Sequence, residues 1–362
     1  MRLSYSLLFV LGFASTLLFT PCYGKDSKKD LKNSAAPVFY PPAPDEPHIQ
    51  FLTSFSSDVQ LAELAGKRTF FRFIVGAAQI EHALTQPYGL AVTPEKLFIC
   101  DSGASTVAIA NLATRKMSFF NPIGEGALGF PVNIAVDSDG TRYIVDTGRD
   151  KVLVYKDDKY VGAIGKQGET KPGGVALYKD RIYVTDKLNH CVHVYAKADR
   201  HELFTFAKES SNQAALLFQP TNIAIDAQGH IRVSDTGGCV VNTYDSEGKY
   251  LATIGKSGLE PGTFARPKGV AVDREDRTYV VDAATQVIQL FDNQGRVLMD
   301  FGNPSTTGGG QTGLPAGIAV DYDNVKYFQS FAASNFAVEY LIFVANQDAP
   351  QKIAVFGFGH KK

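Results

Sequence analysis

Short apolar runs separated by turn residues recur along the chain from about residue 87 onward. One unit contains the apolar run Ile134-Ala135-Val136, the polar segment Asp137-Ser138-Asp139-Gly140 and a second apolar run, Tyr143-Ile144-Val145. Asp and Gly are residues that tight turns favour, so the unit predicts two β-strands joined by a short turn. A single hairpin cannot bury its own faces, and the prediction therefore requires neighbouring units of the same kind.

The chain supplies such neighbours, because the pattern Pro-x-Gly/Asn-apolar-Ala-apolar occurs six times in order. The copies begin at Pro87, Pro131, Pro172, Pro220, Pro267 and Pro315. Their central alanines, at positions 91, 135, 176, 224, 271 and 319, are spaced by 44, 41, 48, 47 and 48 residues. A period of about 40–50 residues with several strands per unit is typical of a β-propeller. The predicted fold is all-β, with six blades of four antiparallel strands.

Each copy continues with further strands that complete a blade. The second strands are predicted at residues 96–100, 141–145, 181–185, 230–234, 278–281 and 325–329. Third strands are predicted at segments such as Lys151-Val152-Leu153-Val154-Tyr155, and fourth strands are short, as in Tyr250 to Gly255. The segment from Ile49 to Phe55 is strand-like without a nearby hairpin partner. We expect it to pair with residues 338–345 or 352–356 and close the ring, while Asp58 to Gly66 forms a helical turn.

Aspartates recur in two turn positions of the repeat. The first set is Asp137, Asp226, Asp273 and Asp321, and the second is Asp101, Asp146, Asp186, Asp235 and Asp282, with Ser330 in the sixth copy. Asp side chains commonly accept hydrogen bonds from backbone amides in turns. These carboxylates are therefore predicted to brace the turns rather than to take part in catalysis.

The units resemble NHL repeats, which form six-bladed β-propellers. The third copy carries the type of turn that gives the repeat its name, Asp186-Lys187-Leu188-Asn189-His190-Cys191-Val192, and the resemblance extends from Pro87 to the C-terminus. It implies the fold much more strongly than an activity, because NHL propellers include ligand-binding, protein-binding and RNA-binding proteins as well as lyases.

Residues 1–24 read as a signal peptide, residues 25–47 as a polar, proline-rich linker and residues 48–362 as the propeller. Arg2 precedes an apolar stretch, Leu7 to Thr20, that is too short to span a bilayer. Cleavage before Lys25 is one alternative, and lipid attachment at Cys22 is the other. The expected location is the periplasm or a membrane-anchored position in the cell envelope, or outside the cell, with membrane contact only through a lipid or an uncleaved signal.

The net charge limits the classes of partner to expect, and the cysteine count limits the expected disulfides. The formal net charge of -1 offers no overall basic field, so no nucleic-acid partner is expected. Ordinary cleavage would leave Cys100, Cys191 and Cys239, an odd number that argues against a disulfide framework. Small buried thiols are the favoured interpretation, with a bridge between Cys191 and Cys239 as the alternative.

Binding residues are expected where the Pro-x-Gly/Asn entries and the turns after the second aspartates meet on one face of the ring. We call this the entry face. Variable residues on a rigid frame are the usual place for recognition, although a solvated polar rim is the alternative. The candidates are Tyr88, Asn133, Arg149, Lys187, His190, Asn222, Arg266 and Lys268. Their basic character favours an anionic ligand or an acidic protein partner.

Asn133 and Asn222 replace the entry glycine in two blades. Asn tolerates positive φ, which is the backbone interpretation. The other interpretation is a Ca²⁺ site in the central channel, because oxygen ligands suit this ion and the Pro-x-Asn-apolar-Ala-apolar-Asp segments resemble those of gluconolactonase-type propellers. The matching positions in the other blades are Gly, without an acidic ligand.

Catalytic motifs are missing from the sequence. The seven histidines do not recur at one blade position, and a zinc site from His190 and His193 is not expected because the two lie three apart on a predicted strand. No nucleophile elbow or phosphate-binding loop occurs. The predicted function is therefore a non-catalytic binding or scaffold protein of the cell envelope. The alternative is a metal-dependent propeller enzyme, either a lyase or a lactonase.

Overall fold

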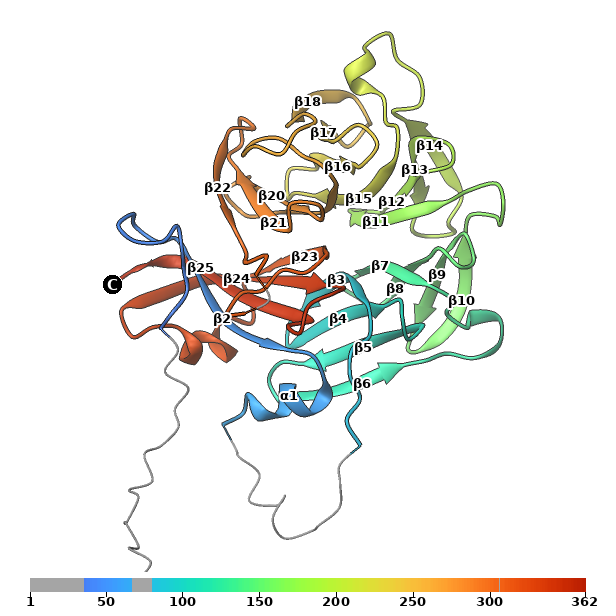
Figure 1. The fold of residues 1–362 in the computed structure, drawn as a ribbon. Coiled ribbons are helices and arrows are strands. Elements are labelled where there is room, and N and C mark those ends of the chain that lie inside the picture. The colour runs from blue at the N-terminus through green and yellow to red at the C-terminus, as the bar shows by residue number, and fades with distance from the viewer. Residues whose placement is uncertain (1–35, 67–79, 306) are drawn as a thin grey trace, which may run out of the picture. The chain divides into compact units, whose positions relative to one another are not determined.

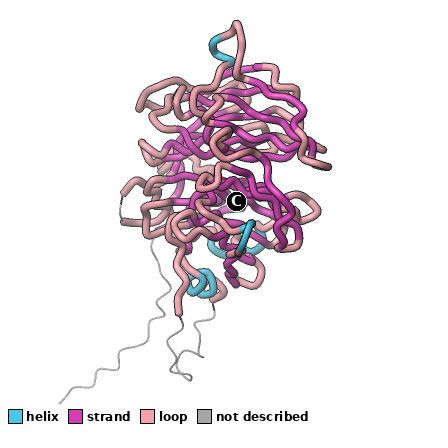
Figure 2. The backbone as a smooth tube through the Cα atoms, turned by 90° about the vertical axis from the view of Figure 1, so that its right-hand side faces the viewer, coloured by secondary structure: helices cyan, strands magenta, loops and turns pink. Residues whose placement is uncertain are grey.

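The computed structural model describes residues 36–66, 80–305 and 307–362, and the signal peptide and Cys22 predicted from the sequence lie outside this part. The described chain forms six antiparallel sheets arranged around a common centre, as Figure 1 shows. Strands are the predominant regular element of the described backbone, and helices are few and short (Figure 2). The prediction of an all-β propeller with six blades is confirmed.

Each blade begins with an inner strand that starts at the repeated proline. These strands are β3 (Pro87–Thr93), β7 (Pro131–Val136), β11 (Pro172–Tyr178), β15 (Pro220–Ile225), β19 (Pro267–Val272) and β23 (Pro315–Asp321). Each inner strand contacts the inner strands of the blades before and after it, and β23 contacts β3. The six inner strands therefore form a closed ring.

The other strands follow outward within each blade. Second strands are β4 (Lys96–Asp101), β8 (Arg142–Asp146), β12 (Arg181–Asp186), β16 (Ile231–Asp235), β20 (Thr278–Asp282) and β24 (Phe336–Asn346). Third strands are β5 (Thr106–Asn111), β9 (Lys151–Lys156), β13 (Cys191–Ala196), β17 (Val240–Tyr244), β21 (Val287–Phe291) and β25 (Ile353–Lys361). Fourth strands are β6 (Lys116–Phe120), β10 (Lys159–Ile164), β14 (Glu202–Phe206), β18 (Tyr250–Ile254) and β22 (Val297–Phe301).

The fourth strand of the sixth blade comes from the beginning of the described chain. β2 (Ile49–Phe55) pairs antiparallel with β25, with Phe51 opposite Phe356 and Phe55 opposite Ile353. Figure 1 shows this as a blue strand lying beside red ones. β1 (Phe39–Tyr40) adds a short fifth strand and lies within the segment predicted to be a linker. The prediction that Ile49 to Phe55 closes the ring on the segment after residue 352 is confirmed.

Helical segments occupy only a few connections. The helix α1 (Asp58–Glu63) confirms the predicted helical turn, and its first turn is capped by the Ser57 hydroxyl, which accepts from the Gln60 amide at 3.1 Å. The 3₁₀ turns are η1 (Gly124–Gly126), η2 (Gln213–Ala215), η3 (Val325–Tyr327) and η4 (Gln329–Phe331). Within the described ranges, no helix has the length and apolar character that a membrane crossing requires.

The sixth blade corrects the sequence prediction. Residues 325–329 lie in η3 and at the start of η4 rather than in a strand, and the second strand is β24, which begins at Phe336. Pro315 pairs with Asn346, as Pro131 pairs with Asp146 in the second blade. Asn346, not Ser330, therefore occupies the second-aspartate position. The segment inserted between the inner and second strands carries aromatic residues that pack into the core, such as Phe328, and it moves the second strand away from the position that the other five copies implied.

The entry glycines are needed for close packing between blades. A Cβ on Gly317 would lie 2.0 Å from the carbonyl oxygen of Tyr88, and one on Gly89 would lie 2.6 Å from the Cα of Asn133. Asn133 and Asn222 are not among the described residues with positive φ, so the interpretation based on backbone conformation is wrong. The entry positions are constrained by neighbouring backbones rather than by their own dihedral angles.

Candidate functional site

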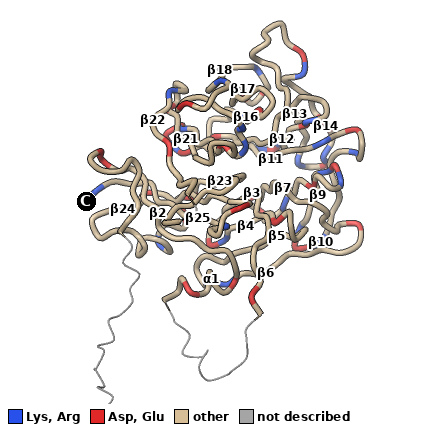
Figure 3. Tube along the Cα trace, in the orientation of Figure 1, with Lys and Arg blue, Asp and Glu red and all other residues tan. Residues whose placement is uncertain are grey.

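Lys and Arg are interspersed with Asp and Glu over the blades, so the overall charge distribution does not single out one face (Figure 3).

The second aspartates hold the backbone of the entry face in place through hydrogen bonds. The Asp146 carboxylate accepts from the amides of Gly129, Phe130 and Gly148 at 2.6, 2.9 and 3.0 Å. Asp101, Asp186, Asp235 and Asp282 bond the equivalent connector and turn amides. The predicted bracing role is confirmed for these positions.

A buried lysine lies on the entry face. The side chain of Lys268, at the start of β19, is 8% exposed. Its ammonium donates to the Gln347 side-chain oxygen at 3.2 Å and lies 5.0 Å from the centre of the Tyr88 ring, which belongs to β3 two blades away. Ala316 occupies the corresponding position of the intervening blade. We call Tyr88, Arg266, Lys268 and Gln347 the lysine cluster.

The electrostatics of this cluster favour an anion. Burial, together with the nearby positive charge of Arg266, lowers the pKa of Lys268 to about 8. Burial raises the pKa of Tyr88, while Arg266 opposes that shift. No Asp or Glu among the described residues forms an ion pair with Lys268 or Arg266. The cluster therefore holds positive charge in a partly desolvated place without a carboxylate to balance it.

Only part of the predicted set comes together in this cluster. Tyr88, Arg266 and Lys268 meet, as expected from the sequence. In the described structure, no hydrogen bond or ion pair joins Arg149, Lys187 or His190 to them. Arg149 donates to the Glu125 carbonyl at 2.6 Å, and the His190 ring contacts the Phe218 carbonyl. Burial lowers the pKa of Lys187, and repulsion from the nearby Lys171 adds to the shift.

Gln347 was missed because the second strand of the sixth blade was misplaced. It follows Asn346 and so corresponds to Lys187, the residue after the second aspartate in the third blade. Gln347 could have been identified if the pairing of Pro315 with Asn346 had been known. The insertion before β24 is long, so the spacing of the repeats did not predict this pairing.

Asn133 and Asn222 use their side-chain oxygens within the protein. The Asn133 oxygen accepts from the Val175 amide in the next blade at 3.2 Å, and the Asn222 oxygen accepts from the Ile223 amide at 2.7 Å. Both residues are buried. The described residues do contain groups of side chains able to hold a metal, but they lie elsewhere, and a Ca²⁺ ion at the two asparagines stays a prediction.

One of these groups lies in the third blade. Cys191 and His193 are two apart on β13 and therefore share a face, next to Asp186 at the end of β12. The His193 Nε2 atom lies 3.5 Å from the Cys191 sulfur and 3.1 Å from a carboxylate oxygen of Asp186, while Nδ1 lies 2.9 Å from Glu202. Burial lowers the pKa of His193, but the hydrogen bonds to Asp186, Cys191 and Glu202 outweigh it and raise the pKa to about 10.

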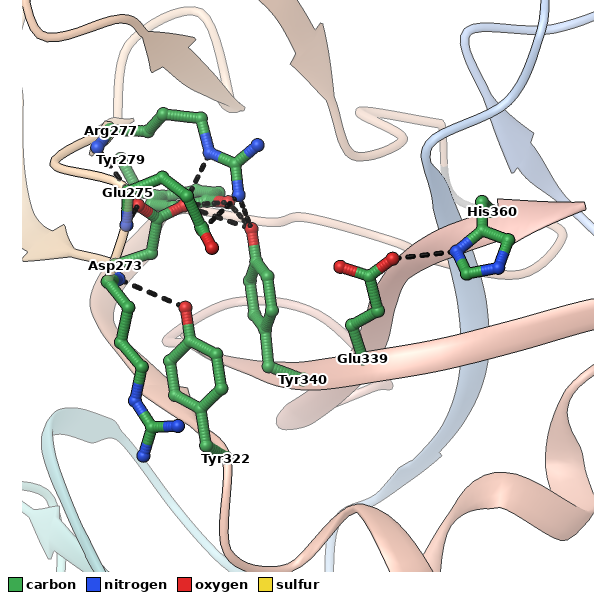
Figure 4. Close-up of polar contacts among 9 residues, drawn as sticks. Asp273, Glu275, Arg277, Tyr279, Tyr322, Glu339, Tyr340 and His360 are labelled. Atoms are coloured by element: carbon green, nitrogen blue, oxygen red, sulfur yellow. Dashed lines mark hydrogen bonds and ion pairs between the residues drawn. The ribbon is translucent and has the colours of Figure 1, made fainter.

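The first-aspartate turns carry ion networks of their own. Asp273 accepts from Arg277, Tyr279 and Tyr340 at 2.6, 3.2 and 3.0 Å, and the two tyrosine hydroxyls are 2.6 Å apart (Figure 4). Burial raises the pKa of both phenols. This network joins the fifth blade to the sixth. Arg277 also lines a hollow of about 790 Å³ together with Tyr40 and Phe358.

A second group of acidic and histidine side chains, Asp226, His230 and Asp276, lies between the fourth and fifth blades. The Arg232 guanidinium donates to both aspartates and is itself 5% exposed. A metal at this position would have to displace a buried arginine. The group is better explained as an ion network between blades.

The three cysteines within the described residues are free, so the interpretation as unpaired thiols is confirmed and the bridge between Cys191 and Cys239 is not formed. Cys100 and Cys191 are buried, and Cys239 is partly buried.

Comparison with known proteins defines the fold more closely than the function. No protein-family model matches the chain, and no curated protein matches it in sequence. A gluconolactonase from Xanthomonas campestris superposes with a TM-score of 0.56 at 13% identity, covering 90% of this chain and 98% of that one. A catalytically inactive virginiamycin B lyase from Staphylococcus aureus gives 0.52 at 14%, covering 76% and 96%. A protein from Bacteroides thetaiotaomicron gives 0.53 at 18%, covering 76% and 70%.

At these identities the likeness extends to the fold alone. Two of the three proteins are enzymes of different kinds, a gluconolactonase and a lyase, and a shared fold does not assign either activity to this chain. Membership of the NHL-repeat family stays a prediction, since no family model matches. The chain is an all-β protein with the six-bladed propeller fold that these solved structures share.

Proposed function

We propose that this protein is a non-catalytic binding propeller, exported to the cell envelope, whose lysine cluster binds a carboxylate or phosphate group of its ligand. The observation that supports this is the buried ammonium of Lys268, which has an amide oxygen and an aromatic ring as partners but no carboxylate among the described residues. Export follows from the signal peptide predicted in the sequence.

A buried charge without a counter-charge lowers the stability of a fold, so its retention needs another reason. An incoming anion would provide the counter-charge that the protein lacks. Arg266 adds a second cation nearby, with no side-chain hydrogen bond or ion pair among the described contacts. The depth of Lys268 favours a small molecule or a single projecting acidic side chain of a protein partner over a flat protein surface.

The test is Lys268→Met, which keeps an unbranched side chain of similar length and removes the charge. Phosphate and citrate titrations followed by calorimetry should show a loss of affinity of at least about tenfold, or about 1.4 kcal/mol. The melting temperature should stay the same or rise, because a buried charge has been removed. Lys249→Met is the matched control, since it removes the same charge at an exposed position.

The pH dependence offers an independent check. Because the pKa of Lys268 is lowered from 10.5 to about 8 in the folded protein, the unfolded chain binds more protons between these values. Stability should therefore rise with pH across this interval, and Lys268→Met should flatten the rise. Anion binding should weaken as pH increases through about 8. Equal affinity of Lys268→Met and the original chain for phosphate and citrate would contradict the proposal. The hollow beside Arg277 would then be the next site to test.

A metal-dependent propeller enzyme is the second candidate, supported by the fold shared with a gluconolactonase and by the asparagines at two entry positions. It requires Ca²⁺ to replace the backbone amides that now bond these side chains. Added Ca²⁺ should then raise the melting temperature, and Asn133→Ala should abolish the rise. No Ca²⁺-dependent shift in either protein would leave the binding function as the better account.

A further inference from the structure

We propose that Asp186, Cys191 and His193 form a Zn²⁺ site at the edge of the third blade, separate from the lysine cluster. The three side chains come from β12 and β13, two neighbouring strands whose pairing places Asp186 opposite Cys191. Asp186 and Cys191 are each 1% exposed, whereas the His193 side chain is 13% exposed. The site is therefore nearly closed but lies close to solvent.

The distances fit a tetrahedral ion. With Zn–S near ~2.3 Å and Zn–N and Zn–O near ~2.1 Å, tetrahedral angles place sulfur and nitrogen roughly 3.6 Å apart and nitrogen and oxygen roughly 3.4 Å apart. The observed separations are 3.5 Å from Cys191 Sγ to His193 Nε2 and 3.1 Å from His193 Nε2 to Asp186. One ligand atom from each of the three residues lies within 4.8 Å of the others. The two separations that involve His193 Nε2 lie about 0.1 and 0.3 Å from the tetrahedral values.

The surrounding hydrogen bonds already orient two of the three donors, His193 and Asp186. The Glu202 carboxylate lies 2.9 Å from His193 Nδ1, which leaves Nε2 directed at Cys191 and Asp186. A carboxylate behind a histidine ligand is the usual support for zinc, because it fixes the ring and strengthens the donor nitrogen. The other oxygen of Asp186 accepts from the amides of Lys171 and Leu188 at 2.9 and 2.8 Å, so this carboxylate is fixed as well.

The repeat itself provides a comparison. In the pairing of second and third strands, Cys191 corresponds to Thr106, Lys151, Val240 and Val287, and His193 corresponds to Ala108, Leu153, Asn242 and Gln289. None of these four blades combines a thiol with an imidazole. Asn242 and Gln289 instead donate to carbonyls of the connecting segments, at 3.0 and 2.8 Å. The fold therefore does not require Cys and His here, and the third blade departs from its sister blades in both positions.

A small cavity of about 10 Å³ borders the group and is lined by Thr170, Asp186, His193 and Tyr195 among others. That volume is close to what a single water molecule needs. We assign the fourth coordination position to water. A thiolate and an imidazole favour Zn²⁺ over Mg²⁺ or Ca²⁺, which prefer oxygen ligands. Binding would release two protons to solvent, one from the Cys191 thiol and one from Nε2 of His193, which now faces Asp186.

The experiment uses the full chain, reduced and stripped of metal, titrated with Zn²⁺ and separately with Co²⁺. Competition with a chromophoric chelator should give one Zn²⁺ per chain, and the melting temperature should rise with Zn²⁺. Co²⁺ should produce a near-ultraviolet charge-transfer band that reports a bond to thiolate. Cys191→Ala should abolish the band, and Cys239→Ala, the matched control, should retain it.

Glu202→Gln keeps the size of an exposed side chain and should fold normally. It should weaken Zn²⁺ binding by about 10- to 100-fold while the charge-transfer band survives at saturating Co²⁺. Absence of the band in the original chain would overturn the site, as would its persistence in Cys191→Ala. If Cys191→Ala proves unstable, unchanged Zn²⁺ affinity in Glu202→Gln would overturn the support assigned to Glu202, and the band in the original chain would still decide the site itself.

Discussion

Phe55→Ala is expected to lower the free energy of unfolding by about 3–5 kcal/mol. Phe55 is the last residue of β2, has no exposed surface, and packs in the core cluster that contains Leu61, Leu97 and Phe343. It also lies opposite Ile353 in the pairing that closes the sixth blade. The loss therefore combines a large core cavity with a weaker junction between distant parts of the chain.

Urea denaturation monitored by circular dichroism would measure the change. Phe218→Ala is the matched control, because the Phe218 side chain is 59% exposed and its removal should cost well under 1 kcal/mol. A second variant, lacking residues 1–56, removes β1 and β2 and leaves β25 as an apolar edge strand. We expect it to aggregate, since an unpaired edge can pair with another copy. A soluble, monomeric truncation with unchanged melting temperature would contradict this account of closure.

The fold could be predicted from the sequence because each copy of the repeat carries the same residues at the same strand and turn positions. The proline, the small residue and the alanine mark an inner strand, and the turn aspartates fix the hairpins on either side. Where the sixth copy inserts residues before Phe336, the other copies no longer determine its register. Helical turns η3 and η4 cannot be separated from a short strand by apolar pattern alone.

The candidate site was less accessible to sequence reasoning. Lys268 and Tyr88 belong to blades that are not adjacent, yet the Lys268 ammonium lies 5.0 Å from the Tyr88 ring centre. Nothing in the repeat pattern specifies how far a lysine side chain reaches across the ring. The spacing of Cys191 and His193 predicts that they share one face of a strand. Their proximity to Asp186 and Glu202 depends on how β13 pairs with β12 and β14, which the repeat pattern alone does not specify.

Asp146→Ala is expected to destabilise the protein by about 3–5 kcal/mol, although it removes no apolar surface. The Asp146 side chain is fully buried, and its carboxylate accepts from the amides of Gly129, Phe130 and Gly148. These amides belong to the connector before the inner strand and to the turn after the second strand, which are joined in the backbone by the bond from the Thr147 amide to the Phe130 carbonyl. Alanine would leave three N–H groups without their carboxylate partner, each at a cost of up to about 1–3 kcal/mol, and water can reach these partly buried amides and reduce that cost.

Asp146→Asn separates the two contributions. It keeps the shape but exchanges one accepting oxygen for a donating NH₂ group, which faces an amide donor, so we expect roughly half or more of the alanine effect. Asp300→Ala, at an exposed strand position, is the matched control and should change stability by less than about 0.5 kcal/mol. Hydrogen exchange should show faster exchange at Gly129 and Phe130 in both Asp146 variants. If these two amides stay protected in the variants and the stability is unchanged, the Asp146 carboxylate does not stabilise the entry face.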